Sequence, residues 1–247
     1  MNEFKEKFFE RYVSTHIIHR KGHPSISDFR KKTVLYDKQL GRFIPKDKAS
    51  KIIDIGCGNG ALVWWLQQKG FQKVTGIDAS EEQISAGTDL GVPNLIKVCV
   101  FSYLRESARD IDLVVARDVL EHFQKPEAHE LCQLIAKVLR PSGRFLVQVP
   151  NAESPFFGRI RYGDLTHEIA YCVSSLNQLL RMSGFAGVRC FPVRPAGLGF
   201  KSCIRFILWR LIEAAMKLCL YSEIGSDGRN SIVTQNIIAI GQPALDE

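Results

Sequence analysis

Short apolar runs and amphipathic segments alternate along most of the chain. Apolar runs closed by glycine, proline or polar residues predict strands; these runs cover residues 51–55, 74–77, 94–101, 112–116, 145–149, 187–193 and 231–241. Apolar residues at helical spacing predict helices; these segments cover residues 4–12, 28–43, 61–68, 80–89, 125–139, 174–180 and 200–221. The alternation predicts a doubly wound α/β fold with seven strands.

The sequence KIIDIGCGNG at residues 51–60 organises this pattern. A buried strand runs into a turn with three glycines, and a helix follows, which is the build of a nucleotide-binding first unit. The glycines and Ala61 also satisfy the loose dinucleotide pattern. Asp54 lies inside the strand end, where a carboxylate needs a partner, and Asp78 ends the next strand.

The run Asp-x-Gly-x-Gly-x-Gly, followed by Gly-Ile-Asp at 76–78, resembles the Rossmann-like S-adenosylmethionine-dependent methyltransferases. The resemblance implies a mostly parallel sheet with an antiparallel last strand, N-terminal helices and a long C-terminal helical insertion. It implies that Asp78 holds both ribose hydroxyls, that the turn passes under the methionine part, and that Asp54 orders the turn and reaches the ammonium group. The cofactor-binding residues expected from it are Asp54, Gly56, Cys57, Gly58, Gly60, Asp78, Ala79, Ser102, Arg117 and Asp118.

The chain departs from this family after the third predicted strand. An acidic residue commonly contacts the adenine amino group there, whereas this sequence has Val100, Phe101 and Ser102. Either Ser102 takes that role, or backbone and apolar contacts hold the adenine.

Residues 117–123, RDVLEHF, resemble the family's motif after the fourth strand. Ligands of open α/β sheets bind at the carboxyl ends of the strands, which favours a functional role for Asp118 and His122 over a helix-capping role for His122. The Asn-Pro-Pro-aromatic signature of many amine methyltransferases is absent here, which argues against that chemistry.

Residues 150–169 form a long polar segment after the fifth strand, where specificity is expected. The segment continues with a histidine, an aromatic residue, Ser-Ser-Leu at 174–176, Leu-Leu at 179–180 and Gly-Phe at 184–185. This order is similar to small-molecule and glycan methyltransferases, and that resemblance implies that His167 faces the acceptor. His167 with Asp164 then forms a base and its helper, unless the two form only a loop-stabilising pair. We place His167 first and His122 second as general base, because a histidine accepts a proton near neutral pH.

The distribution of charge and the cysteines bear on the partners of the protein and on its cellular compartment. Residues 1–51 hold 13 Lys and Arg against 6 Asp and Glu, and the remainder balances at 20 against 20. A basic arm suits nucleic acid, an anionic membrane or a phosphorylated substrate, whereas its interleaved acids equally suit a solvated helical face.

Seven cysteines without a CxxC pair, and a charged start that is not a secretion signal, indicate reduced core cysteines in a cytoplasmic protein. His16, His19 and His23 lie beside Arg20 and Lys21, and we expect no metal.

The segment 200–221 is a helix that the basic fold does not require. Its apolar face, with basic residues beside it, suits packing within or between subunits, an interfacial position on an anionic membrane at the inner face, or a cover over the substrate. We expect one domain, with a helical cap at 1–50, a cofactor-binding core at 51–195, the helical insertion at 196–230 and the last strand at 231–241.

The run Asp-Leu-Thr-His-Glu at 164–168 and the ending Thr-Gln-Asn-Ile-Ile-Ala at 234–239 are similar to bacterial methyltransferases of surface-glycan pathways. That resemblance implies methyl transfer from S-adenosylmethionine to a hydroxyl of a sugar or lipid-linked glycan. The alternatives are a quinone-like or other small metabolite as acceptor, and a cofactor-binding regulatory protein without turnover. A nicotinamide dehydrogenase is disfavoured by Asp54 and the Asp118–His122 cluster. Nucleic acid is an unfavoured partner because no recognition module accompanies the basic excess. A homodimer stays open.

Overall fold

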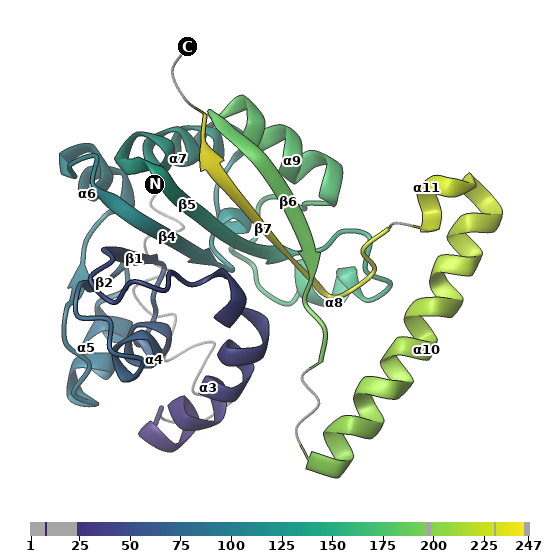
Figure 1. The fold of residues 1–247 in the computed structure, drawn as a ribbon, viewed down its shortest axis with the longest axis horizontal. Coiled ribbons are helices and arrows are strands. Elements are labelled where there is room, and N and C mark those ends of the chain that lie inside the picture. Colours follow the sequence, from purple (N-terminus) through teal and green to yellow (C-terminus); the bar gives the residue numbers. More distant parts are fainter. Residues whose placement is uncertain (1–7, 9–23, 196–198, 230, 245–247) are drawn as a thin grey trace.

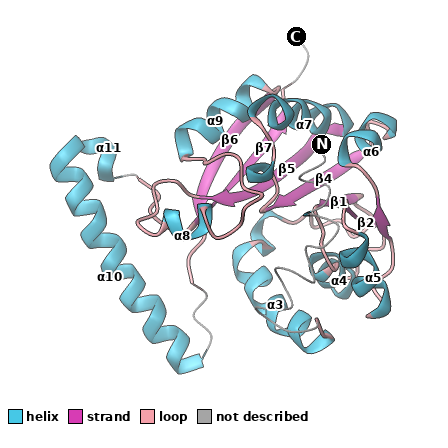
Figure 2. Cartoon of the chain, turned by 180° about the vertical axis from the view of Figure 1, so that it is seen from behind, coloured by secondary structure: helices cyan, strands magenta, loops and turns pink. Residues whose placement is uncertain are grey.

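A computed structural model describes residue 8 and residues 24–195, 199–229 and 231–244. The helix expected over 4–12 and the histidines at 16, 19 and 23 therefore lie outside the described residues, apart from Phe8. Seven strands form one sheet in the order β3-β2-β1-β4-β5-β7-β6. Figures 1 and 2 show helices on both sides of this sheet. Its strands are β1 (Ile52–Ile55), β2 (Val74–Asp78), β3 (Leu95–Lys97), β4 (Ile111–Arg117), β5 (Leu139–Pro150), β6 (Phe185–Pro192) and β7 (Asn236–Pro243).

Strand direction follows the predicted class. The strands from β1 to β5 pair in parallel, and β7 pairs antiparallel with both β5 and β6. The helices are α3 (Ile26–Gln39), α4 (Ala61–Gln68), α5 (Glu81–Asp89), α6 (Val100–Glu106), α7 (Lys125–Val138), α8 (Phe157–Arg161), α9 (Val173–Met182), α10 (Gly199–Ile224) and α11 (Ser226–Arg229), with 3-10 turns η2 (Gly41–Phe43) and η3 (Leu120–His122). The doubly wound prediction is confirmed.

Both faces of the sheet are covered, which explains why its central strands are continuous apolar runs. Successive residues of β1 enter opposite cores: Ile53 packs with α6, α7 and α9, whereas Ile52 packs with α3 and α4. Trp65 of α4 is fully buried, and its indole N–H donates to Asp37 of α3 at 3.0 Å. The N-terminal helix α3 is thereby fixed beside the first unit of the sheet.

The third predicted strand is partly wrong. Strand β3 covers only Leu95–Lys97, and the chain turns into α6 at Val100. β3 lies at the edge of the sheet, so a longer strand would gain pairing on one side only. The helix instead buries Leu104 completely and sets Phe101 edge-on against Phe123 at 5.6 Å.

Two smaller predictions also change. Residues 140–144, which separate the helix predicted at 125–139 from the strand predicted at 145–149, lie within β5. Leu139 pairs with Ile111 and Arg144 with Leu113, so residues 140–143 bulge opposite Asp112. The cysteines are not uniformly in the core, because Cys57 and Cys132 are buried whereas Cys99, Cys203 and Cys219 are exposed. All seven are free thiols in the structure.

Candidate functional site

Two cavities meet over the glycine turn at the carboxyl ends of β1, β2 and β4. The first has a volume of about 550 Å³ and the second about 570 Å³. Gly56, Gly58, Gln83 and Asp118 line both of them. An elongated ligand that crosses the glycine turn therefore fits this arrangement better than a compact one.

The glycines are required by the local backbone. Gly56 has a φ of 64°, and a Cβ added there would overlap the Val119 side chain. Cys57 donates its backbone N–H to Ile77 O at 3.1 Å, and the N–H of Gly60 returns to Cys57 O at 3.0 Å. The turn is thus anchored to β2 while its upper surface stays open to a ligand.

Asp78 joins the turn to the next helix. Its Oδ2 accepts from the Gly58 N–H and its Oδ1 from the Ser80 N–H, each at 2.8 Å. Burial raises the pKa of Asp78, and these backbone donors oppose the rise. Asp78 and Ala79 both line the first cavity. Each carboxylate oxygen has a further lone pair, so Asp78 can accept from the two hydroxyls of a ribose.

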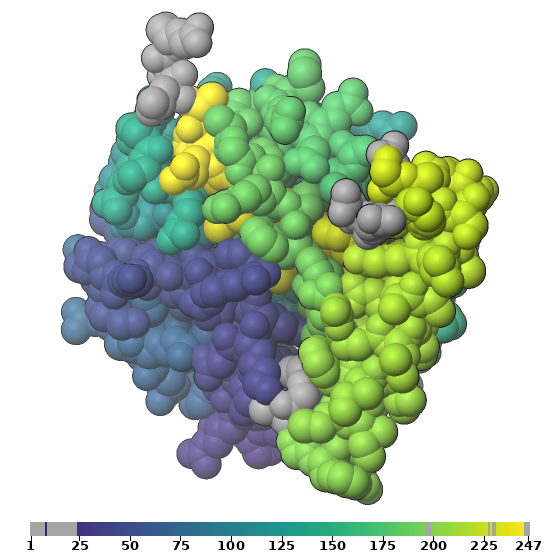
Figure 3. Space-filling model, turned by 45° about the vertical axis from the view of Figure 1, so that its right-hand side comes forward, coloured from purple at the N-terminus to yellow at the C-terminus, as the bar shows by residue number. Residues whose placement is uncertain are grey.

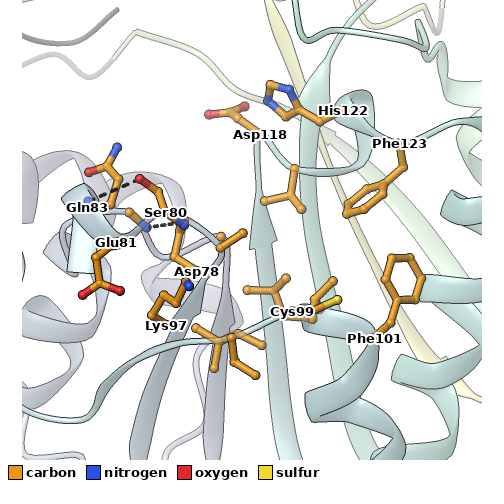
Figure 4. A pocket seen from close by; sticks show the side chains of 18 of the residues that line it. Asp78, Ser80, Glu81, Gln83, Lys97, Cys99, Phe101, Asp118, His122 and Phe123 are labelled. Carbon is orange, nitrogen blue, oxygen red and sulfur yellow. Dashed lines mark hydrogen bonds between the residues drawn. The ribbon is translucent and has the colours of Figure 1, made fainter. Parts of the chain in front are cut away.

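The rest of the first cavity is largely apolar. Ile77, Val98, Val100, Phe101 and Phe123 line it. Figure 4 shows Phe101 and Phe123 on one side and Asp78 with Ser80 on the other. This slot suits a planar base held by apolar contacts. Ser102 is exposed on α6 and does not line the cavity, so its position favours the alternative in which backbone and apolar groups hold the adenine.

The second cavity carries the charged groups. Asp54 is 3% exposed, and burial, opposed by Arg117, raises its pKa to about 7. The Arg117 guanidinium lies 4.9 Å from the centre of the buried Tyr36 ring, and its buried Nε has no hydrogen-bond partner among the described residues. A carboxylate and a guanidinium with an unused donor match the ammonium and carboxylate of an amino acid.

Asp118 lies between the two cavities in an unusual backbone conformation. Its φ is 58°, a region that residues other than glycine seldom occupy and that clusters at functional sites. Its N–H donates to Gln148 O at 2.9 Å, and the Gln148 amide donates back to both carboxylate oxygens at 3.1 and 3.2 Å. Gln148 is buried on β5 and was not among the sequence-predicted residues, because its spacing carries no motif.

His122 and His167 come together, although the sequence separates them widely. Their ring centres are 4.8 Å apart at an interplanar angle of 63°. The Thr166 hydroxyl donates to Asp164 Oδ1 at 2.6 Å and lies 2.8 Å from His122 Nδ1. Because that hydroxyl has one proton, His122 Nδ1 is the donor to it, and a neutral His122 carries no proton on Nε2.

The Asp164 side chain contacts Thr166, and its role as helper of His167 stays a prediction. Its Oδ1 also accepts the Thr166 N–H at 2.9 Å, which stabilises the loop. The same carboxylate orients His122 through Thr166, whereas the sequence analysis placed it as helper of His167. Burial lowers the pKa of His167, and the Asp164 charge opposes this shift.

Glu121 is the most unusual group in this region. It is 1% exposed, and neither carboxylate oxygen has a hydrogen-bond partner among the described residues. Burial, reinforced by the charges of Asp118 and Asp164, raises its pKa well above the ordinary value. Ligand atoms of Glu121, His122 and His167 lie within 4.8 Å of one another, so these three could hold a metal ion. The order of residues along the chain does not reveal this group, because its members lie on η3 and in a distant loop.

The residues fit the cofactor implied by the sequence. The glycine turn gives close backbone access, Asp78 offers acceptors for a ribose, and the buried donor on Arg117 has no partner within the described protein. Of the ten cofactor-binding residues expected, Ser102 lies outside both cavity linings, and so does Gly60, which ends the turn before α4.

Known proteins resemble this chain in sequence and in fold. A ubiquinone biosynthesis O-methyltransferase of Caulobacter vibrioides is 34% identical over 108 residues, 40% of this chain and 40% of that protein. The chain thus matches about two-fifths of the length of such curated relatives. An S-adenosylmethionine-dependent methyltransferase from Archaeoglobus fulgidus superposes with a TM-score of 0.63 at 22% identity, over 87% of this chain and 96% of that one.

A second solved structure shares the fold with lower identity. Phosphoethanolamine N-methyltransferase 2 of Haemonchus contortus, in complex with phosphomonomethylethanolamine and S-adenosylhomocysteine, superposes with a TM-score of 0.61 at 14% identity. The match covers 96% of this chain and 60% of that one. A family model described as a methyltransferase domain matches residues 29–189, which is most of the chain. The protein therefore belongs to the methyltransferase domain family and has the Rossmann-like fold of its S-adenosylmethionine-dependent members.

Proposed function

We propose that this protein transfers the methyl group of S-adenosylmethionine to a hydroxyl oxygen of a small organic acceptor. When bound, the cofactor supplies a methyl group on a positively charged sulfur, which is already an electrophile. The chain must hold the cofactor across the glycine turn, align the acceptor, and take the proton of the hydroxyl. The family, the two joined cavities and the histidine pair support this assignment.

The hydrogen-bonded row of Asp164, Thr166 and His122 is the observation that carries the proposal. It fixes the His122 ring and its tautomer, so that Nε2 can accept the acceptor's proton. Burial lowers the pKa of the neighbouring His167, which favours a neutral ring beside His122. We therefore infer that His122 is the base and that His167 contacts the acceptor, which reverses the order of the sequence analysis.

A phenolic hydroxyl of a quinone-like molecule is the acceptor class that the relatives favour, since the curated relatives include ubiquinone biosynthesis O-methyltransferases. A sugar hydroxyl on a lipid-linked glycan stays the second candidate, because the polar segment at 150–169 borders the histidine pair. Both are hydroxyl acceptors and need the same base. The two differ in the pKa of the hydroxyl, so the phenol depends less on His122 than the sugar does.

The test measures release of S-adenosylhomocysteine by the full chain with simple catechols bearing an alkyl tail and with alkyl glycosides. Replacement of His122 by alanine should lower turnover at least about a hundredfold while the affinity for S-adenosylmethionine is retained. His129, which contacts Ser183 between α7 and α9 at 3.0 Å, provides the matched control, and its replacement by alanine should leave turnover intact.

Cofactor binding separates the alternatives. Calorimetric titration with S-adenosylmethionine, S-adenosylhomocysteine and NAD should show binding of the first two and its loss in Asp78→Ala. Binding without product release for any acceptor would favour a regulatory protein. Preferential binding of NAD would overturn the methyltransferase proposal.

A further inference from the structure

Helix α10 stands beside the α/β body as a separate rod, as Figures 1 and 2 show. It runs for 26 residues from Gly199 to Ile224, about 39 Å at 1.5 Å per residue. Among the described residues of this helix, only Glu213 is buried. A helix of this length that buries a single side chain leaves nearly all of its surface for another partner.

Glu213 marks the side of α10 that faces the protein. Its carboxylate accepts from Arg194 at 2.8 and 2.9 Å and from Arg210 at 3.1 Å, and Lys217 lies 3.5 Å away. Arg194 follows β6, so this cluster ties the helix to the sheet. These hydrogen bonds and charges hold the pKa of Glu213 below its ordinary value. Three cations around one carboxylate leave a net positive charge beside the helix.

The opposite side of α10 is an exposed apolar face. At 100° per residue, the five residues at the centre of this face lie within an arc of about 60° on the side of the helix that points away from Glu213. Phe200 is 83% exposed, Leu211 64% and Leu218 65%. The face consists of Phe200, Ile204, Ile207, Leu211 and Leu218, widened on one side by the exposed Leu208 and Ile212. Figure 3 shows the helix along the outer border of the molecule, where solvent reaches it. Large exposed apolar patches generally mark interaction sites on proteins.

Charges beside the strip distinguish its occupant. Lys201 and Arg205 lie on one flank, with Glu223 of the last turn in the direction of Arg205. Arg210 and Lys217, which also contact Glu213, lie on the other flank. Ile204, Leu211 and Leu218 are seven residues apart, a spacing that paired helices also use. In such a pair the charged residues at the flanking positions would be Lys201, Arg210 and Lys217, with no acidic residue among them. Two copies of the helix would therefore place cations opposite cations or uncharged residues. Anionic lipid headgroups complement both flanks.

We propose that α10 lies in the plane of an anionic bilayer, with its apolar face in the acyl region and its flanking cations at the phosphates. No helix within the described part of the chain is long and apolar enough to cross a membrane. The helix α8 and the carboxyl ends of β4 and β5 lie at the same end of the sheet as α10 (Figures 1 and 2). If the proposed function holds, membrane contact brings the acceptor side of the site close to amphiphilic substrates.

Flotation of the full chain with lipid vesicles tests this proposal. Vesicles of phosphatidylcholine with about one-third phosphatidylglycerol should carry the protein, and pure phosphatidylcholine should carry markedly less. The double variant Ile207→Glu with Leu211→Glu should lower the partition coefficient by at least about tenfold. Met182→Glu on α9 is the matched control, because Met182 is equally exposed (70%) and lies outside the face.

Two further measurements show whether the basic residues contribute to vesicle binding and whether the apolar face binds a second copy of the chain instead. Lys201→Glu with Arg205→Glu should abolish the preference for anionic vesicles and its dependence on salt. Sedimentation equilibrium of the vesicle-free protein tests for a dimer formed through the apolar face. A dimer of this kind would dissociate in the Ile207→Glu and Leu211→Glu variant, and we expect none. Such a dimer, or equal vesicle binding by variant and parent, would overturn the proposal. Titration with S-adenosylmethionine shows independently whether each variant is folded, and none of these readouts requires turnover.

Discussion

Asp54 offers the sharpest test of the site, because its burial has a consequence for stability. Burial raises the pKa of Asp54 to about 7 in the folded protein, whereas an aspartate in an unfolded chain has a pKa of about 3.9. Between these values the folded state holds a proton that the unfolded state has released. Stability from this group is therefore fully present below about pH 4 and is lost as the pH rises to about 7.

The magnitude follows from the two pKa values. The loss amounts to about 1.5 kcal/mol at about pH 5 and about 4 kcal/mol at about pH 8. Asp54→Asn removes the titration and keeps the shape of the side chain. The free energy of unfolding of the variant, relative to the parent, should therefore rise by about 2.5 kcal/mol between those two pH values.

Denaturant unfolding of the cofactor-free protein at both pH values measures this difference. Asp89→Asn, at the exposed end of α5, is the control and should show no such change, because solvent screens an exposed charge. A difference for Asp54→Asn that stays constant within about 0.5 kcal/mol would refute the reasoning. The same variant should bind S-adenosylmethionine at least about tenfold more weakly, since it loses a charged acceptor for the ammonium group.

Three further changes have defined outcomes. Gly56→Ala should destabilise the protein by about 3 kcal/mol, because Gly56 has a positive φ and the new Cβ overlaps a neighbouring side chain. The control Gly70→Ala has a φ of 89° and open space around the new Cβ, so it should cost about 1 kcal/mol. Denaturant unfolding measures both values. Thr166→Val should lower turnover about tenfold at unchanged cofactor affinity, because His122 loses its orienting hydroxyl, and Thr166→Ser should restore it. Glu213→Gln should lower stability by about 1 kcal/mol at neutral pH, and the difference should vanish as the pH falls through the lowered pKa of that carboxyl, as unfolding at several pH values would show.

The sequence predicts the glycine turn and Asp78 well, because the local backbone conformation and the order of the strands determine where they lie. The glycine turn needs positive φ angles at Gly56 and Gly58, and only a few arrangements of strand and helix place such a turn. Asp78 ends β2 by position alone, so its location over the cavity follows from the order of the strands. The prediction was weaker at β3, where the apolar run after Lys97 suits a strand or a helix equally.

The acceptor side could not be predicted to the same depth. The closeness of His122 and His167 depends on how the loop after β5 folds back over η3, and Glu168 and Ile169 donate their N–H groups to Glu121 O to fix that path. No periodicity encodes such a contact. The isolated carboxyl of Glu121 and the amide of Gln148 likewise gain their meaning only from neighbours that the fold supplies.

Helix α10 lies in the connection between β6 and β7, and its position there allows the helix to be exchanged without a change in strand pairing. Pro192 of β6 pairs with Ile237 of β7, so the chain departs from and returns to neighbouring positions of one antiparallel ladder. A short hairpin turn could close the same ladder, and each doubling of the connection costs only about 0.6 kcal/mol of closure entropy. The cofactor-binding architecture is thus energetically almost indifferent to what is inserted here. The β6–β7 connection can therefore carry an inserted element such as α10 without a change in the residues that line the two cavities.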